Sequence, residues 1–80
     1  VFSQSRLERA FQDSVIGIDH SLNIIVIRTV PGLAQAVAYA IDSIKWPEII
    51  GTVGGDDTII VVVKPPEAAG DVFAKFRALV

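Results

Sequence analysis

The segment 22-LNIIVIRTVPGLAQAVAYAIDSIK-45 contains a strand, a break and a helix in that order. Its first part, residues 22–28, is rich in isoleucine and valine, as β-strands are. Pro31-Gly32 interrupts the strand, and apolar residues then recur every three or four positions from Leu33 onward, the spacing of an amphipathic helix. Trp46-Pro47 is predicted to end this helix, because the residue before a proline avoids the α region.

Upstream of this segment, the sequence predicts a short helix and a first strand. Residues 3–12 place apolar side chains on one face and charged ones elsewhere, and Ser3 is the candidate cap of that helix. Residues 14–18 form the predicted strand. The polar cluster 19–21 is interpreted as the turn of a hairpin that joins this strand to residues 22–28.

Downstream, the same order of elements occurs a second time. Residues 49–53 and 58–63 are predicted to form another hairpin, followed by a helix. A shift of 35 positions aligns Pro31 with Pro66, which precedes that helix. We therefore predict a single domain over residues 1–80 with a two-layer α+β fold. Tandem strand-strand-helix units would form a four-stranded, mainly antiparallel sheet with two long helices on one face, preceded by the short N-terminal helix.

The strands at 22–27 and 59–63 are almost continuously apolar, whereas a strand with one solvent-exposed face alternates between apolar and polar residues. A continuous apolar run is expected to be covered on both faces. Two helices cover one face of the predicted sheet, and 51% of the residues are hydrophobic, which is high for so small a domain. We therefore expect part of the other face to contact another subunit.

The composition excludes several classes of protein. Without cysteine, the chain has no disulfide framework and no thiolate metal site. No apolar run reaches the ~18 residues that span a bilayer. Seven Lys and Arg against nine Asp and Glu give a net charge of −2, which disfavours direct binding of nucleic acid. We expect a cytoplasmic protein, and the absence of methionine suggests a fragment of a longer chain.

The segment Gly54-Gly55-Asp56-Asp57-Thr58 joins the second pair of strands. Glycine and aspartate are common in tight hairpin turns, so a purely structural turn is one interpretation. The other interpretation is a binding loop, because two adjacent carboxylates repel each other unless a cation or several donors satisfy them. The two glycines would also allow a ligand or another backbone to approach closely.

A second group of polar side chains lies on the predicted helix over 33–45. Gln35 and Asp42 are seven residues apart and project from nearly the same face, with Tyr39 beside them. This face is either a solvated helix edge or part of a binding site. The backbone amides of residues 31–34 at the helix start favour a carboxylate. Acceptors for a cation and donors for an anion together match a free amino acid, and paired carboxylates suit a guanidinium.

An enzymatic interpretation has to use the same residues. Asp42, Asp56 and Asp57 supply oxygen ligands for Mg²⁺, but neither a phosphate-binding loop nor a base accompanies them. His20 is the only histidine and falls in a predicted turn. No spacing supports a Ser-His-Asp arrangement. We expect a domain that is not an enzyme and holds no metal.

Three motifs resemble one known family: 29-TVPGLAQA-36, Ile41-Asp42 and 46-WPEIIGTVGGDDTI-59. In order and spacing they are similar to the C-terminal domain of bacterial arginine repressors, over essentially the whole chain. The resemblance implies a regulator that forms trimers, pairs two trimers into a hexamer, and binds L-arginine between them. L-arginine would act as the corepressor of arginine biosynthesis genes.

The resemblance also implies which residues bind L-arginine. These are Gln35, Asp42, Asp56 and Asp57, with Ala34 and Thr58 as neighbours. We expect Asp56 to take the guanidinium across the subunit interface, with Asp57 as the alternative in the same doublet. Gln35 and Asp42 would hold the amino acid end.

Two features depart from the family. Gly54 replaces the alanine or cysteine that is usual there, and we expect this glycine to loosen the loop. The winged helix-turn-helix that reads operator DNA in the family is not among these residues, so DNA binding is expected only through that missing N-terminal domain. The alternatives are a ligand-independent oligomerisation module and a regulatory domain for another amino acid.

Overall fold

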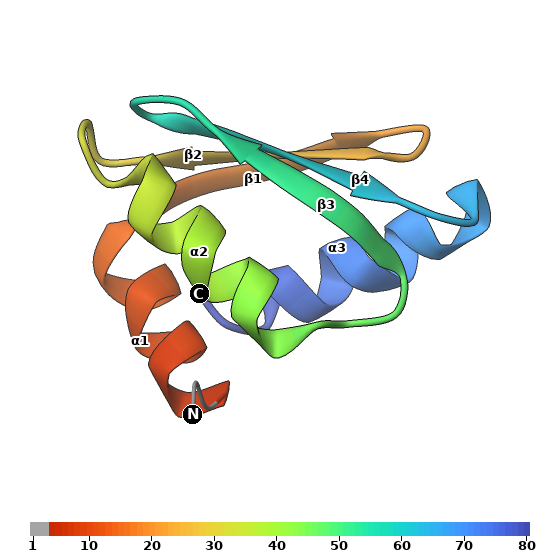
Figure 1. Ribbon diagram of the computed structural model, residues 1–80, viewed down its shortest axis with the longest axis horizontal. Coiled ribbons are helices and arrows are strands. Elements are labelled where there is room, and N and C mark those ends of the chain that lie inside the picture. Colours follow the sequence, from red (N-terminus) through yellow and green to blue (C-terminus); the bar gives the residue numbers. More distant parts are fainter. Residues whose placement is uncertain (1–3) are drawn as a thin grey trace.

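The computed structural model describes residues 4–80. Along the chain the elements are α1 (Gln4–Ser14), β1 (Val15–Ser21), β2 (Ile24–Thr29), α2 (Ala34–Ile44), β3 (Ile49–Gly54), β4 (Thr58–Val63), the 3-10 turn η1 (Pro66–Ala68) and α3 (Ala69–Arg77). The strand order is β1-β2-β4-β3, with every neighbouring pair antiparallel. Figure 1 shows α1, α2 and α3 on the same side of this sheet. Within residues 4–80, no helix has the length and apolar character needed to cross a membrane.

The two strand-strand-helix units predicted from the sequence are present. α2 begins at Ala34 and α3 at Ala69, 35 positions apart. Val37 and Val72 are buried at equivalent positions of the two helices. The second strands of the units, β2 and β4, pair with each other at the centre of the sheet. The α+β two-layer fold is therefore confirmed.

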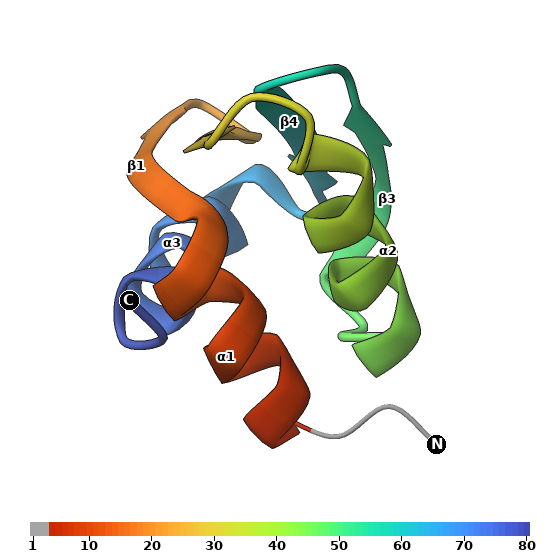
Figure 2. The ribbon, with the colours of Figure 1, turned by 90° about the vertical axis from the view of Figure 1, so that its left-hand side faces the viewer.

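Helix α1 closes the core between the other two helices. Its Leu7 and Phe11 side chains are fully buried, and the Phe11 ring stacks on Phe76 of α3 with 5.3 Å between centroids. The Trp46 ring lies 5.2 Å from the same Phe76 ring. Figure 2 shows α1 running away from the sheet between α3 on one side and α2 on the other. An aromatic cluster thus connects α1, α3 and the segment that follows α2.

The predicted boundaries of the first hairpin were wrong. Residues 19–21, predicted to be the turn, belong to β1 and pair with β2, and the turn lies at Leu22-Asn23 instead. These polar residues remain in the strand because the His20 ring packs on Phe73 of α3, 4.4 Å between centroids. α1 also continues beyond residue 12 and, at 11 residues, is as long as α2. The predicted cap, Ser3, lies outside the described residues.

Residues 4–80 leave the sheet face opposite the helices uncovered. In β4, Ile59 and Val61 are fully buried on the helix side, whereas Ile60 is 42% exposed on the outer side. The apolar residues of this outer sheet face include Ile24, Val26, Val53, Ile60 and Val62. The continuous apolar runs of the sequence therefore place buried residues on the helix side of the sheet and partly exposed apolar residues on the outer side.

Candidate functional site

Main-chain hydrogen bonds fasten the acidic loop between β3 and β4 to the start of α2. The Asp56 carbonyl accepts the amides of Gly32 and Ala34, at 3.0 and 3.3 Å. The Asp57 carbonyl accepts the Thr29 amide at 2.8 Å. Because these bonds use carbonyl oxygens, they leave both carboxylates available for other contacts.

The amides of residues 32–34, predicted to be open to a carboxylate, are paired within the chain. The amides of Gly32 and Ala34 already donate to Asp56, and the Leu33 amide donates to the Val30 carbonyl at 3.1 Å. The first amides of a helix lack partners within the helix, and here carbonyls of the chain itself accept the amides of residues 32–34. The Gln35 and Ala36 amides form no hydrogen bond within residues 4–80, so they stay open to a ligand carboxylate.

Gly54 brings β3 into close contact with α2. A Cβ at this position would lie 3.2 Å from Ala38 Cβ and 3.3 Å from both the Ala34 carbonyl oxygen and Gln35 Cα. The glycine therefore permits tight packing of the loop against the helix, contrary to the loosening that we expected. It also places the exposed Gln35 beside the acidic loop.

The two carboxylates of the loop differ in their contacts. Asp57 Oδ1 accepts the Thr58 hydroxyl at 3.1 Å, and Asp57 Oδ2 lies 3.7 Å from Arg28 Nη2. The Asp56 side chain is exposed, and nothing within residues 4–80 forms a hydrogen bond or ion pair with its carboxylate. Arg28 partly neutralises the acidic pair, so Asp56 offers the open acceptor oxygens.

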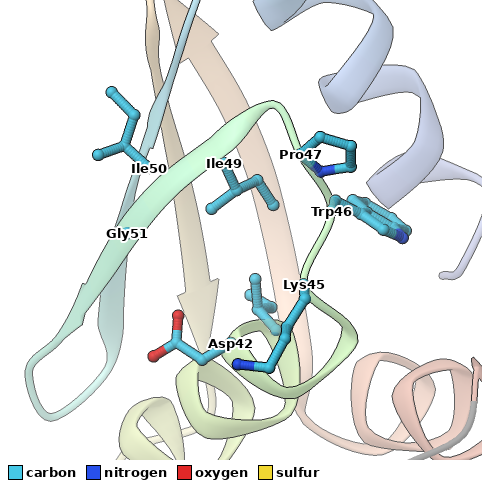
Figure 3. A pocket seen from close by; sticks show the side chains of 8 residues that line it. Asp42, Lys45, Trp46, Pro47, Ile49, Ile50 and Gly51 are labelled. Carbon is cyan, nitrogen blue, oxygen red and sulfur yellow. The ribbon is translucent and has the colours of Figure 1, made fainter.

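Asp42 lies apart from the acidic loop, near the other end of α2. Its Oδ1 accepts the Thr52 hydroxyl of β3 at 2.9 Å. It also lines a pocket of about 420 Å³ between the end of α2 and the start of β3, together with Lys45 and Trp46 (Figure 3). Eight residues separate Asp42 from Ala34, which corresponds to about 12 Å along a helix.

The six predicted binding residues therefore form two groups. The loop group, where the acidic loop meets α2, consists of Ala34, Gln35, Asp56, Asp57 and Thr58. The other group is Asp42 with the pocket beside it. Sequence reasoning missed Arg28, Thr52 and Lys45. Arg28 and Thr52 lie on strands and are brought to the two groups by the assembly of the sheet, whereas Lys45 follows the last residue of α2. No local sequence pattern signals such contacts.

Comparison with known proteins identifies the family. The model described as "Arginine repressor, C-terminal domain" matches residues 11–78. The chain is 62% identical over 76 residues to the arginine repressor of Pelotomaculum thermopropionicum, covering 95% of this chain and 50% of that relative. It is 61% identical over 74 residues to the arginine repressor of Moorella thermoacetica, covering 92% and 49%. It is 56% identical over 77 residues to that of Syntrophomonas wolfei, covering 96% and 50%.

The chain spans about half the length of the curated relatives that it matches. Their shared name describes a repressor and not an enzyme, in agreement with the non-enzymatic function expected from the sequence. The family model covers the helices and strands from the last turn of α1 through α3. The chain therefore belongs to the arginine repressor family and corresponds to the C-terminal domain of its members.

Proposed function

We propose that this domain binds L-arginine as the corepressor of arginine biosynthesis genes, and that the ligand controls its assembly. The observation that carries the proposal is the free Asp56 carboxylate. If the aspartates only shaped a turn, their side chains would hydrogen-bond nearby amides. The loop is instead held by the Asp56 and Asp57 carbonyls, and the Asp56 carboxylate makes no hydrogen bond or ion pair within residues 4–80.

The chemistry of the two groups supports arginine as the ligand. Asp56 would accept the guanidinium, with Asp57 and Thr58 beside it, because a planar guanidinium donates parallel hydrogen bonds to carboxylates. Gln35 and Asp42 would hold the amino acid end, and Ala34 would be a neighbour in the loop group.

We propose that each arginine bridges two subunits of a homo-oligomer, built as two trimers that pair into a hexamer. Asp42 lies about 12 Å along α2 from the start of the helix, where its own acidic loop is attached. A facing subunit that brings its acidic loop to the Asp42 end would complete the site. Without ligand the carboxylates of facing subunits repel each other, and a bridging guanidinium replaces this repulsion with charge-assisted hydrogen bonds.

L-arginine is expected to raise the midpoint of thermal unfolding. At a free concentration of about 100 times the dissociation constant, a ligand that binds only the folded assembly stabilises it by about 2.7 kcal/mol per site. Citrulline has nearly the same shape but an uncharged ureido group, so it serves as the control. Scanning calorimetry at one protomer concentration would measure both. No upward shift with L-arginine, or an equal shift with citrulline, would contradict the proposed ligand.

The outer sheet face is the surface that we assign to contact between subunits. Changing Ile60 to Glu is expected to raise the subunit dissociation constant at least ~100-fold, because burying an unpaired charge in an apolar interface is strongly unfavourable. Leu22→Glu is the control, because Leu22 is 86% exposed in the β1–β2 turn, outside this face. Sedimentation velocity would compare the sizes of the species. An unchanged size for the Ile60 variant would rule out this face as the contact.

A ligand-independent oligomerisation module remains the second candidate function. The Asp57 carboxylate favours it, because Arg28 and the Thr58 hydroxyl already give that group partners within the subunit. This alternative predicts oligomers whose size does not respond to L-arginine.

We assign contact with operator DNA to the half of the relatives' length that this chain does not span. The net charge of −2 supports that assignment, because DNA-binding surfaces carry excess positive charge. A repressor that acts on operator DNA would work in the cytoplasm of a bacterial cell.

A further inference from the structure

Arg28 connects the acidic loop with the outer sheet face. Its neighbours in β2 are buried on the helix side, so Arg28 projects from the outer side, where it is paired with Thr58 of β4. Its Nη2 atom lies 3.7 Å from Asp57 Oδ2. Figure 1 shows the end of β2 and the β3–β4 loop at the same end of the sheet. The acidic loop therefore already contacts a guanidinium that belongs to the chain itself.

The ion pair between Arg28 and Asp57 is weak enough to be exchanged. Its N–O distance of 3.7 Å is longer than a hydrogen bond, and the two side chains are 57% and 45% exposed. Exposed ion pairs contribute little free energy, because water solvates both charges when the pair opens. A guanidinium that makes direct hydrogen bonds with the acidic loop is therefore able to displace Arg28.

Arg28 also has a second carboxylate within reach. Gly17 of β1 stands directly opposite Arg28 and places no side chain beside it. A pocket of about 480 Å³ lies here on the outer sheet face, lined by Gly17, Asp19, Val26 and Arg28 among others. Asp19 pairs with Val26 and is thus the diagonal neighbour of Arg28, a separation that long side chains span. The Asp19 carboxylate forms no ion pair within residues 4–80.

We propose that Arg28 is an internal competitor of the ligand guanidinium and exchanges between two carboxylates. In the empty site it pairs with Asp57, and when L-arginine binds the acidic loop, Arg28 turns across Gly17 toward Asp19. Two guanidinium groups at one acidic loop repel each other, so the ligand binds more weakly while Arg28 stays there. The inference rests on the proposed binding of L-arginine. It makes Arg28 and Asp19 residues that set the L-arginine concentration at which the site fills.

Removing the competitor is expected to strengthen ligand binding. Arg28→Gln should lower the dissociation constant for L-arginine about two- to fivefold, the effect of one exposed charge pair. Arg28→Lys keeps a cation beside Asp57 and should bind L-arginine like the unmodified chain. Lys64→Gln controls for net charge, because it removes a positive charge just beyond the other end of β4. Isothermal titration calorimetry at one protomer concentration would measure each affinity.

Removing the second carboxylate is expected to act in the opposite direction. Asp19→Asn should weaken L-arginine binding by a similar factor, because Arg28 then stays at Asp57. In the Arg28→Gln background the same Asp19 substitution should have no effect, since no guanidinium is left to exchange. This double-mutant cycle separates the exchange from a general effect of charge, which would act in both backgrounds alike.

The outcomes separate this inference from the proposed function. Unchanged or weaker binding by Arg28→Gln, or an equal gain in Arg28→Lys, would overturn the competition. An Asp19 effect of the same size in both backgrounds would overturn the exchange. In each of these cases L-arginine binding by the unmodified chain leaves the proposed function standing. If the unmodified chain binds no L-arginine, the proposed function fails, and this inference fails with it.

Discussion

Replacing Asp56 by asparagine is expected to weaken L-arginine binding about 10- to 150-fold without disturbing the fold. The loss corresponds to one hydrogen bond with a charged group, worth about 1.5–3 kcal/mol. Asparagine has nearly the same shape and keeps one acceptor oxygen, but it carries no negative charge for the guanidinium. The fold should persist because the loop uses the Asp56 carbonyl, and the Asp56 carboxylate has no partner within residues 4–80.

Isothermal titration calorimetry at one protomer concentration would measure the affinity, and circular dichroism would verify the fold. Asp71→Asn is the matched control, because it removes the same charge from the first turn of α3, away from the acidic loop. Asp57→Asn is a less clean probe, since the Asp57 carboxylate also contacts Arg28 and Thr58 within the subunit. Unchanged affinity in the Asp56 variant would mean that this carboxylate does not contact arginine. The ligand-independent oligomerisation module would then be the better explanation.

Replacing Phe76 by alanine is expected to destabilise the domain by about 3–5 kcal/mol, the usual cost of removing a buried phenylalanine. Phe76 is fully buried, and its ring contacts Phe11 and Trp46 at centroid distances of 5.3 and 5.2 Å. A domain of this size has a total stability of roughly 4–12 kcal/mol. The loss is therefore a large fraction of the total, and the variant is expected to unfold at a clearly lower urea concentration than the unmodified chain.

Phe73→Ala is the control on the same helix, because Phe73 is only half-buried and its ring packs on His20. Its loss should be clearly smaller than that of Phe76→Ala. Urea unfolding at a fixed protomer concentration would compare the two, since subunit association adds to the apparent stability. Equal losses would show that the aromatic cluster is not the centre of the core.

Local sequence patterns predicted the helices and strands well where the apolar residues form a continuous run or recur at a regular spacing. The strand at Thr58–Val63 has the predicted bounds, because a run of β-branched residues follows a glycine-rich loop and is ended by prolines. The 35-residue repeat of the helix starts was also visible in the sequence. The first hairpin was misplaced because residues 19–21 are polar. Their strand conformation depends on pairing with β2 and on the contact between His20 and Phe73.

The candidate site was predictable in composition but not in arrangement. The acidic pair and the helix residues Gln35 and Asp42 were identifiable from residue type and spacing. The separation of Asp42 from the acidic loop was not, and neither was the capture of the Gly32 and Ala34 amides by Asp56. The position of Asp42 and the pairing of these amides both depend on how α2 packs against β3 and the loop that follows it.

The sequence by itself determined the family, the order of helices and strands, and the pair of carboxylates in the loop. These follow from residue type and short-range spacing, which the chain carries before it folds. Only the tertiary structure decided that the Gly32 and Ala34 amides bind the Asp56 carbonyl, that Lys45 shares a pocket with Asp42, and that residues 4–80 leave one sheet face uncovered. The reason is that hydrogen-bond satisfaction and packing join residues far apart in the chain, and their partners are fixed only when the sheet and helices assemble.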